Sequence, residues 1–107
     1  MAVAMAASPA EGMPPEMQAT FERLRERFVA GLPQRWQEID AAGSGPALAA
    51  ALHRLVGAAA SYGLGALGDA AREAEALAGG PDGTPSPACA AALARLRRCI
   101  DDVVTVR

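Results

Sequence analysis

The chain of 107 residues suits a single domain, because a chain of this length buries enough surface for one core. Alanine is its commonest residue and large apolar side chains are few, so the composition favours closely packed helices over a sheet. The net charge of -2 excludes the basic stripe of a nucleic-acid-binding protein, and the absence of lysine excludes P-loop and Schiff-base chemistry.

The first segment, residues 1–14, is apolar and rich in alanine but has no positively charged start. We therefore expect a disordered leader and not a signal peptide. The sequence also lacks an uncharged apolar run long enough to cross a membrane, so no membrane contact is expected.

The next segment is an amphipathic helix that starts at Pro15 and carries apolar residues at steps of three or four. Its apolar stripe consists of Met17, Phe21, Leu24, Phe28, Leu32, Trp36 and Ile39. Gly31 and Pro33 interrupt the segment without shifting the phase of the stripe. The pattern favours one long helix kinked near Pro33, and two separate helices remain the alternative.

Three further helices follow. The second begins after Ser44 or Gly45, with Pro46 in its first turn, and extends to about Tyr62. The third follows the Gly63-Leu64-Gly65 break and extends to about Ala78. After the loop at residues 79–85, Ser86 is the expected cap of the fourth helix. The inward stripe of this last helix is Cys89, Leu93, Leu96, Ile100 and Val103.

The predicted fold is all-α, an antiparallel four-helix bundle over residues 15–107 with a kinked long first helix. Cys89 and Cys99 are ten residues apart on one helix, about 15 Å along its axis, which is too far for a disulfide. Free thiols favour the cytoplasm, and the spacing of Cys and His residues predicts no metal site.

His53 is the only histidine of the chain. The core stripe of its helix is Leu48, Leu52, Leu55, Ala59 and Tyr62, and His53 lies more than a quarter-turn from the centre of this stripe. We therefore expect the imidazole to face solvent and not the core.

The helix surface around His53 is made of small or apolar residues, namely Ala49, Ala50, Val56, Gly57 and Ala60. Gly57 costs about 1 kcal/mol relative to alanine inside a helix, which a sequence so rich in alanine would avoid without a reason. One hypothesis is a floor on which a partner approaches the ring. The alternative is that these small residues only permit close packing of helices within the chain.

The order His53-Arg54-Leu55-Val56-Gly57, followed by small residues, Tyr62-Gly63-Leu64, Leu67 and an Ala-Arg-Glu-Ala-Glu stretch at residues 71–75, resembles the histidine phosphotransfer (HPt) domain of two-component phosphorelays. The family pattern is His-x-Leu-Lys-Gly. The resemblance extends from about Met17 to Val104. Val56 stands where the family usually has lysine, and Ala74 where it usually has leucine.

The resemblance implies a phosphoryl carrier and not an enzyme. Nε2 of His53 would accept a phosphoryl group from an aspartyl phosphate on a response-regulator receiver domain and return it to another receiver. Mg²⁺ would belong to the receiver, since this chain has no carboxylate cluster to bind it and no cofactor of its own is expected. A hybrid sensor kinase is a further expected partner, and the chain is expected to be a monomer.

The same resemblance implies docking through Ala49, Ala50, Val56, Gly57 and Ala60, with Phe21 and Leu24 beside or beneath them. Arg54 either biases the encounter or is an ordinary solvated arginine, while Trp36 and Tyr62 are expected in the core. Because Val56 removes the family's lysine, a module that binds a kinase or receiver without being phosphorylated is the alternative function. An unrelated helical bundle with a surface histidine is a third interpretation.

Overall fold

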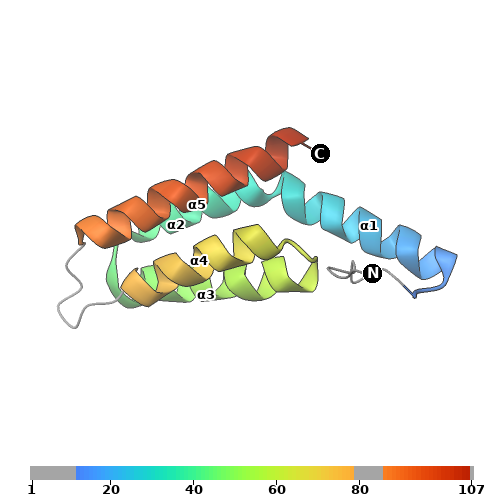
Figure 1. Cartoon of the computed structure of the whole chain (residues 1–107), viewed down its shortest axis with the longest axis horizontal. Coiled ribbons are helices and arrows are strands. Elements are labelled where there is room, and N and C mark those ends of the chain that lie inside the picture. The colour runs from blue at the N-terminus through green and yellow to red at the C-terminus, as the bar shows by residue number, and fades with distance from the viewer. Residues whose placement is uncertain (1–11, 79–85, 107) are drawn as a thin grey trace, which may run out of the picture.

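The computed structural model describes residues 12–78 and 86–106 and contains five helices (Figure 1). They are α1 (Pro15–Ala30), α2 (Leu32–Ala42), α3 (Gly45–Ser61), α4 (Gly65–Ala78) and α5 (Pro87–Val106). No strand occurs among the described residues. The prediction of an all-α protein is therefore confirmed. The leader expected at residues 1–14 and the loop expected at residues 79–85 fall mostly or wholly outside the described residues.

The segment predicted as one kinked helix forms two helices, α1 and α2, which are separated by Gly31 alone. The N–H of Gly31 donates to the carbonyls of Arg27 and Phe28, both at 3.1 Å. Pro33 is the second residue of α2 and has no N–H to donate to the preceding turn, so the ladder of helical hydrogen bonds is interrupted there. The expectation of a single helix is corrected to two helices that succeed each other almost without a gap.

Helices α2 to α5 form a closed ring in which each helix packs against the next and α5 packs against α2. Consecutive helices run in opposite directions because the connections between them are short (Figure 1). Gly43 and Gly63 lie in these connections with φ of 77° and 71°, a conformation that residues with a Cβ rarely adopt.

The core of this ring consists of leucines separated by alanines. Leu32, Leu48, Leu52, Leu55 and Leu96 are fully buried. Ala59, Ala71, Ala74 and Ala92 are equally buried and keep the helices close together. A Cβ built on Gly68 would lie 3.7 Å from the Cβ of Ala59, an ordinary van der Waals distance, so α4 packs directly against α3 at this point. Small core residues thus bring α3 and α4 near enough for side chains at their edges to meet.

Helix α1 extends beyond the end of the ring (Figure 1). Two members of its predicted apolar stripe are consequently exposed, Met17 at 55% and Leu24 at 42%. Closer to the ring, Tyr62 stacks on Phe28 with ring centroids 5.1 Å apart and contacts Phe21 at 5.7 Å. Within α1, the apolar stripe is therefore covered where the helix passes the α3–α4 connection and is uncovered at Met17 and Leu24.

The predicted caps of α3 and α5 and the predicted inward stripe of α5 are observed in part. The hydroxyl of Ser86 accepts a hydrogen bond of 3.0 Å from the N–H of Cys89, as expected of a cap. Ser44 precedes α3 but makes no such bond. Within α5, Cys89, Leu96 and Ile100 are buried, whereas Leu93 and Val103 are half-buried. Both cysteines are free thiols.

Candidate functional site

His53 lies on the outer side of α3, and 77% of its side chain is exposed. The leucines before and after it, Leu52 and Leu55, have no exposed surface. The exposure expected from its place on the helix is therefore observed, and the imidazole is not a core residue.

One side chain from α4 holds the imidazole. Nδ1 of His53 lies 2.9 Å from Oε2 of Glu75, whose own side chain is 28% exposed. A carboxylate can only accept, so the ring must donate through Nδ1–H. The neutral ring then keeps its lone pair on Nε2, which makes this atom the available nucleophile.

Glu75 was not among the residues singled out from the sequence, although it belongs to the Ala-Arg-Glu-Ala-Glu stretch at residues 71–75. It is 22 positions after His53, and only the register of α4 against α3 brings the two together. The signal available in the sequence was a glutamate on the edge of a helix expected to follow that of His53.

The outer surface of α3 around His53 is formed by small side chains. Ala50, Gly57, Ala60 and Ser61 are all exposed. The hydroxyl of Ser61 donates to the carbonyl of Gly57 at 3.0 Å and so turns back onto its own helix. We call these four residues the small-residue face. No side chain rises from it beside the imidazole to obstruct an approaching partner.

Gly57 has free space where a side chain would begin. A Cβ built on Gly57 meets no atom within 4 Å. Close packing inside the described part of the chain therefore does not require a glycine at this position. The space that a Cβ of Gly57 would occupy lies on the exposed side of the helix and is free.

The other predicted docking residues are placed differently. Ala49 and Val56 are half-buried and pack against the core, so they form the edge of the face toward α4 and not its centre. Arg54 is exposed, but it lines a shallow pocket with residues of α2 and the α1–α2 break, namely Gly31, Gln34, Arg35 and Glu38. The described contacts of His53 thus involve Glu75 and not Arg54.

A groove of about 490 Å³ adjoins the small-residue face on the side of α1 and α2. Its floor and walls are Leu24, Arg27, Phe28, Gly31, Arg35, Ala58, Ser61 and Tyr62. The guanidinium of Arg35 lies over the ring of Phe28 at 5.2 Å. Leu24 therefore lies beside the face as expected, while Phe21 packs on Tyr62.

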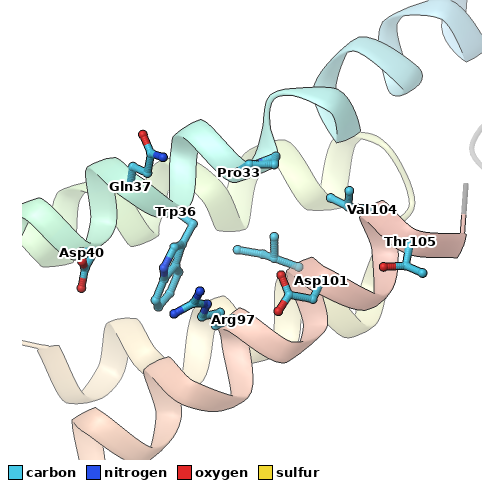
Figure 2. A pocket seen from close by; sticks show the side chains of 9 residues that line it. Pro33, Trp36, Gln37, Asp40, Arg97, Asp101, Val104 and Thr105 are labelled. Atoms are coloured by element: carbon cyan, nitrogen blue, oxygen red, sulfur yellow. The ribbon is translucent and has the colours of Figure 1, made fainter.

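A second groove, of about 460 Å³, lies between α2 and α5 (Figure 2). Trp36 and Arg97 enter it from opposite helices, with the guanidinium 5.9 Å from the indole ring (Figure 2). Asp40 and Asp101 add carboxylates to its lining. The two helices that form it carry neither His53 nor Glu75, so it is a separate feature. Trp36, expected in the core, is only half-buried.

No group of three or more His, Cys, Asp or Glu side chains that could hold a metal ion occurs within residues 12–78 and 86–106. None of the helices in these ranges is both long and apolar enough to span a membrane.

Comparison with known proteins identifies one family. The model of the Hpt domain matches residues 16–105. Neither a curated protein nor a solved structure matches the chain. Hpt domains are phosphocarrier modules that transfer phosphoryl groups through a histidine in two-component signalling. With a match that covers nearly all five helices, the chain belongs to the Hpt domain family.

Proposed function

We propose that this chain is a phosphorelay intermediate in which His53 accepts a phosphoryl group from the aspartyl phosphate of one receiver domain and passes it to another. The observation that carries the proposal is the exposed imidazole, held through Nδ1 by Glu75 at 2.9 Å, with Nε2 left free.

In the forward step, the lone pair of Nε2 attacks the phosphorus atom of the aspartyl phosphate. The bond between phosphorus and the aspartate oxygen breaks, and the carboxylate leaves with the electron pair of that bond. No proton has to move, since Nδ1–H remains bonded to Glu75. The product is an imidazolium that carries the phosphoryl group, and its positive charge faces the carboxylate of Glu75. The return step reverses these events on a second receiver.

Glu75 acts in this scheme as a positioning residue. It selects the tautomer with the proton on Nδ1 and orients the ring, and it stabilises the positive charge that the ring acquires when Nε2 becomes bonded to phosphorus. Mg²⁺ would be supplied by the receiver, where it would offset charge on the phosphoryl group during transfer.

The small-residue face supports docking of a receiver at His53. Because the residues around the ring are small, a partner can bring an aspartyl phosphate within bonding distance of Nε2 without displacing side chains. Ala50, Gly57 and Ala60 lie at the centre of the proposed contact, with Ala49, Val56 and Arg54 at its edges. A hybrid sensor kinase is a further proposed partner, and the protein is proposed to act as a cytoplasmic monomer.

A second candidate function is a module that docks on a kinase or receiver and regulates it without carrying phosphate. Val56 favours this alternative, because the turn after His53 offers no cation of its own to a phosphoryl group.

The test is incubation of the chain with a phosphorylated receiver, in parallel with His53→Gln. We expect an acid-labile label on the wild type and none on the variant, which changes an exposed residue and keeps the fold. Binding of the receiver to both proteins without label on either would replace the carrier by the docking module. Label on His53→Gln would contradict the assignment of His53.

A further inference from the structure

Phosphorylation of His53 would create an electrostatic problem at this site. A phosphoryl group adds about 1.5 to 2 negative charges at neutral pH. It would be attached to a ring whose other nitrogen lies 2.9 Å from the carboxylate of Glu75. Charges at this separation are not screened by salt at physiological ionic strength. A cation within reach of Nε2 would offset the repulsion.

The register between α3 and α4 shows which arginine lies at the right level. His53 faces Glu75, and Ala59 faces Gly68, so the two helices are antiparallel and in step between these contacts. Arg72 precedes Glu75 by three residues and is therefore level with Val56, which follows His53 by three. The offset along the helix axes is about 4.5 Å, which is shorter than an extended arginine side chain.

Arg72 is also free to change its partner. Its side chain is 64% exposed, and its ion pair is a single contact of 3.2 Å with Asp69, which is itself 80% exposed. Exposed pairs of this kind contribute little to stability. A phosphoryl group carries more charge than a carboxylate and offers oxygens that match the fork of a guanidinium.

Two other arginines near the site are engaged elsewhere. Arg95 makes two hydrogen bonds to Glu73, at 3.2 and 2.8 Å, across the α4–α5 contact. Arg54 lines the pocket against α2. The carboxylate of Glu75 is thus the charged group in contact with the ring, and Arg72 is the arginine of α4 that the register brings to the level of the turn after His53.

We propose that Arg72 gives up its ion pair with Asp69 and binds the phosphoryl group on His53. Arg72 would thus supply from α4 the positive charge that Val56 does not supply from α3. This inference rests on the proposed phosphorylation of His53. It makes Arg72 a phosphoryl-binding residue and Asp69 its partner in the unphosphorylated state.

The test uses phosphoramidate, a small phosphoryl donor that needs no docking surface, so only the chemistry at the ring is measured. The rate of His53 labelling is compared among the wild type, Arg72→Gln, Arg72→Lys and the matched control Arg98→Gln, which changes an exposed arginine of α5. We expect Arg72→Gln to lower the rate about fivefold, as loss of one exposed ionic contact implies, and Arg98→Gln to match the wild type. Arg72→Lys should retain part of the effect, since the charge remains without the fork.

A second measurement follows the side-chain Nε–H resonance of Arg72 in the ¹⁵N spectrum. The chemical shift of this resonance should change when His53 is phosphorylated. Phosphorylation of His53 in the Asp69→Asn variant should also change it. An unchanged resonance, or equal labelling rates for Arg72→Gln and the wild type, would overturn the role of Arg72 while leaving the carrier function intact. A wild type that takes no label on His53 from phosphoramidate or from a receiver would overturn the carrier function, and this inference with it.

Discussion

Helices α3 and α5 are both amphipathic, with buried leucines on one side, but their solvent-facing sides differ. On α5 the outer positions are exposed alanines as far as Ala94 and include, after it, Arg95, Arg98 and Asp102, the usual residues of a hydrated helix. On α3 they include Ala50, Gly57 and Ala60 around the single histidine. Solvent exposure alone does not produce this difference, because both surfaces face water. Docking of a partner over His53, as proposed above, would account for the small residues of α3.

The largest effect should come from adding bulk to the α3 surface and not to the α5 surface. Ala60→Arg places a long side chain on the small-residue face, and Ala94→Arg places the same side chain on an exposed position of α5. We expect Ala60→Arg to slow transfer from a phosphorylated receiver about 50-fold, as overfilling a packed contact does, and Ala94→Arg to leave it unchanged.

Labelling by phosphoramidate distinguishes an effect on docking from an effect on the imidazole itself. Labelling by this small donor should be equal in the wild type, Ala60→Arg and Ala94→Arg. If Ala60→Arg also slowed labelling by phosphoramidate, the substitution would be acting on the ring and not on docking.

A smaller effect is expected from Glu75, which acts on the ring itself. Glu75→Ala should slow labelling by both receiver and phosphoramidate about tenfold, because the ring loses its orientation and its preference for Nδ1–H. The tautomer can be followed in ¹⁵N spectra of the imidazole. The matched control is Glu73→Ala, which removes the pair with Arg95 on the α4–α5 side. Equal rates for the two variants would remove Glu75 from the mechanism.

The exposed histidine of this site could be predicted from the sequence, but its contact with Glu75 could not. The outward position of His53 follows from the leucine spacing of a single helix, which is local information. The contact with Glu75 depends on the position of α4 along α3, which follows from the packing of the whole helix pair, Gly68 beside Ala59 included. Nothing in the spacing of one helix specifies this register.

The difference between the pattern of one helix and the packing between helices also explains why the prediction of a single kinked first helix was wrong. The apolar phase of residues 15–42 continues through Gly31, so periodicity could not separate a kinked helix from two helices with one residue between them. Met17 and Leu24 belong to that phase but are exposed, because α1 passes beyond the end of the helices that would cover them. The length of the neighbouring helices is not visible in the pattern of α1.

Gly57→Ala should produce opposite changes in stability and function. The added methyl group has open space around it and removes the helix penalty of glycine, so the free energy of unfolding should rise by about 0.5 to 1 kcal/mol. Transfer from a receiver should nevertheless fall about fivefold, since the methyl group lies where the partner approaches. Thermal unfolding and transfer rates measure the two changes. A gain in stability with unchanged transfer would show that the partner does not come close to Gly57.

The smallest effect is expected in the groove between α2 and α5. Arg97→Gln removes the guanidinium that lies over Trp36 and should cost about 0.5 kcal/mol of stability, the usual value of an exposed cation–π contact. Transfer rates should stay within about twofold of the wild type, because this groove is formed by helices without His53. A large loss of transfer in Arg97→Gln would place the partner on this side of the molecule as well.

The proposed function requires that a receiver dock on the outer surface of α3, over His53. The most direct measurement is a titration of the ¹⁵N-labelled chain with a receiver domain, followed through the backbone amide resonances. We expect the resonances of Ala50, His53, Gly57 and Ala60 to shift and those of Ala94, Arg98 and Asp102 to stay in place. Shifts concentrated on α5, with the α3 surface unaffected, would contradict it.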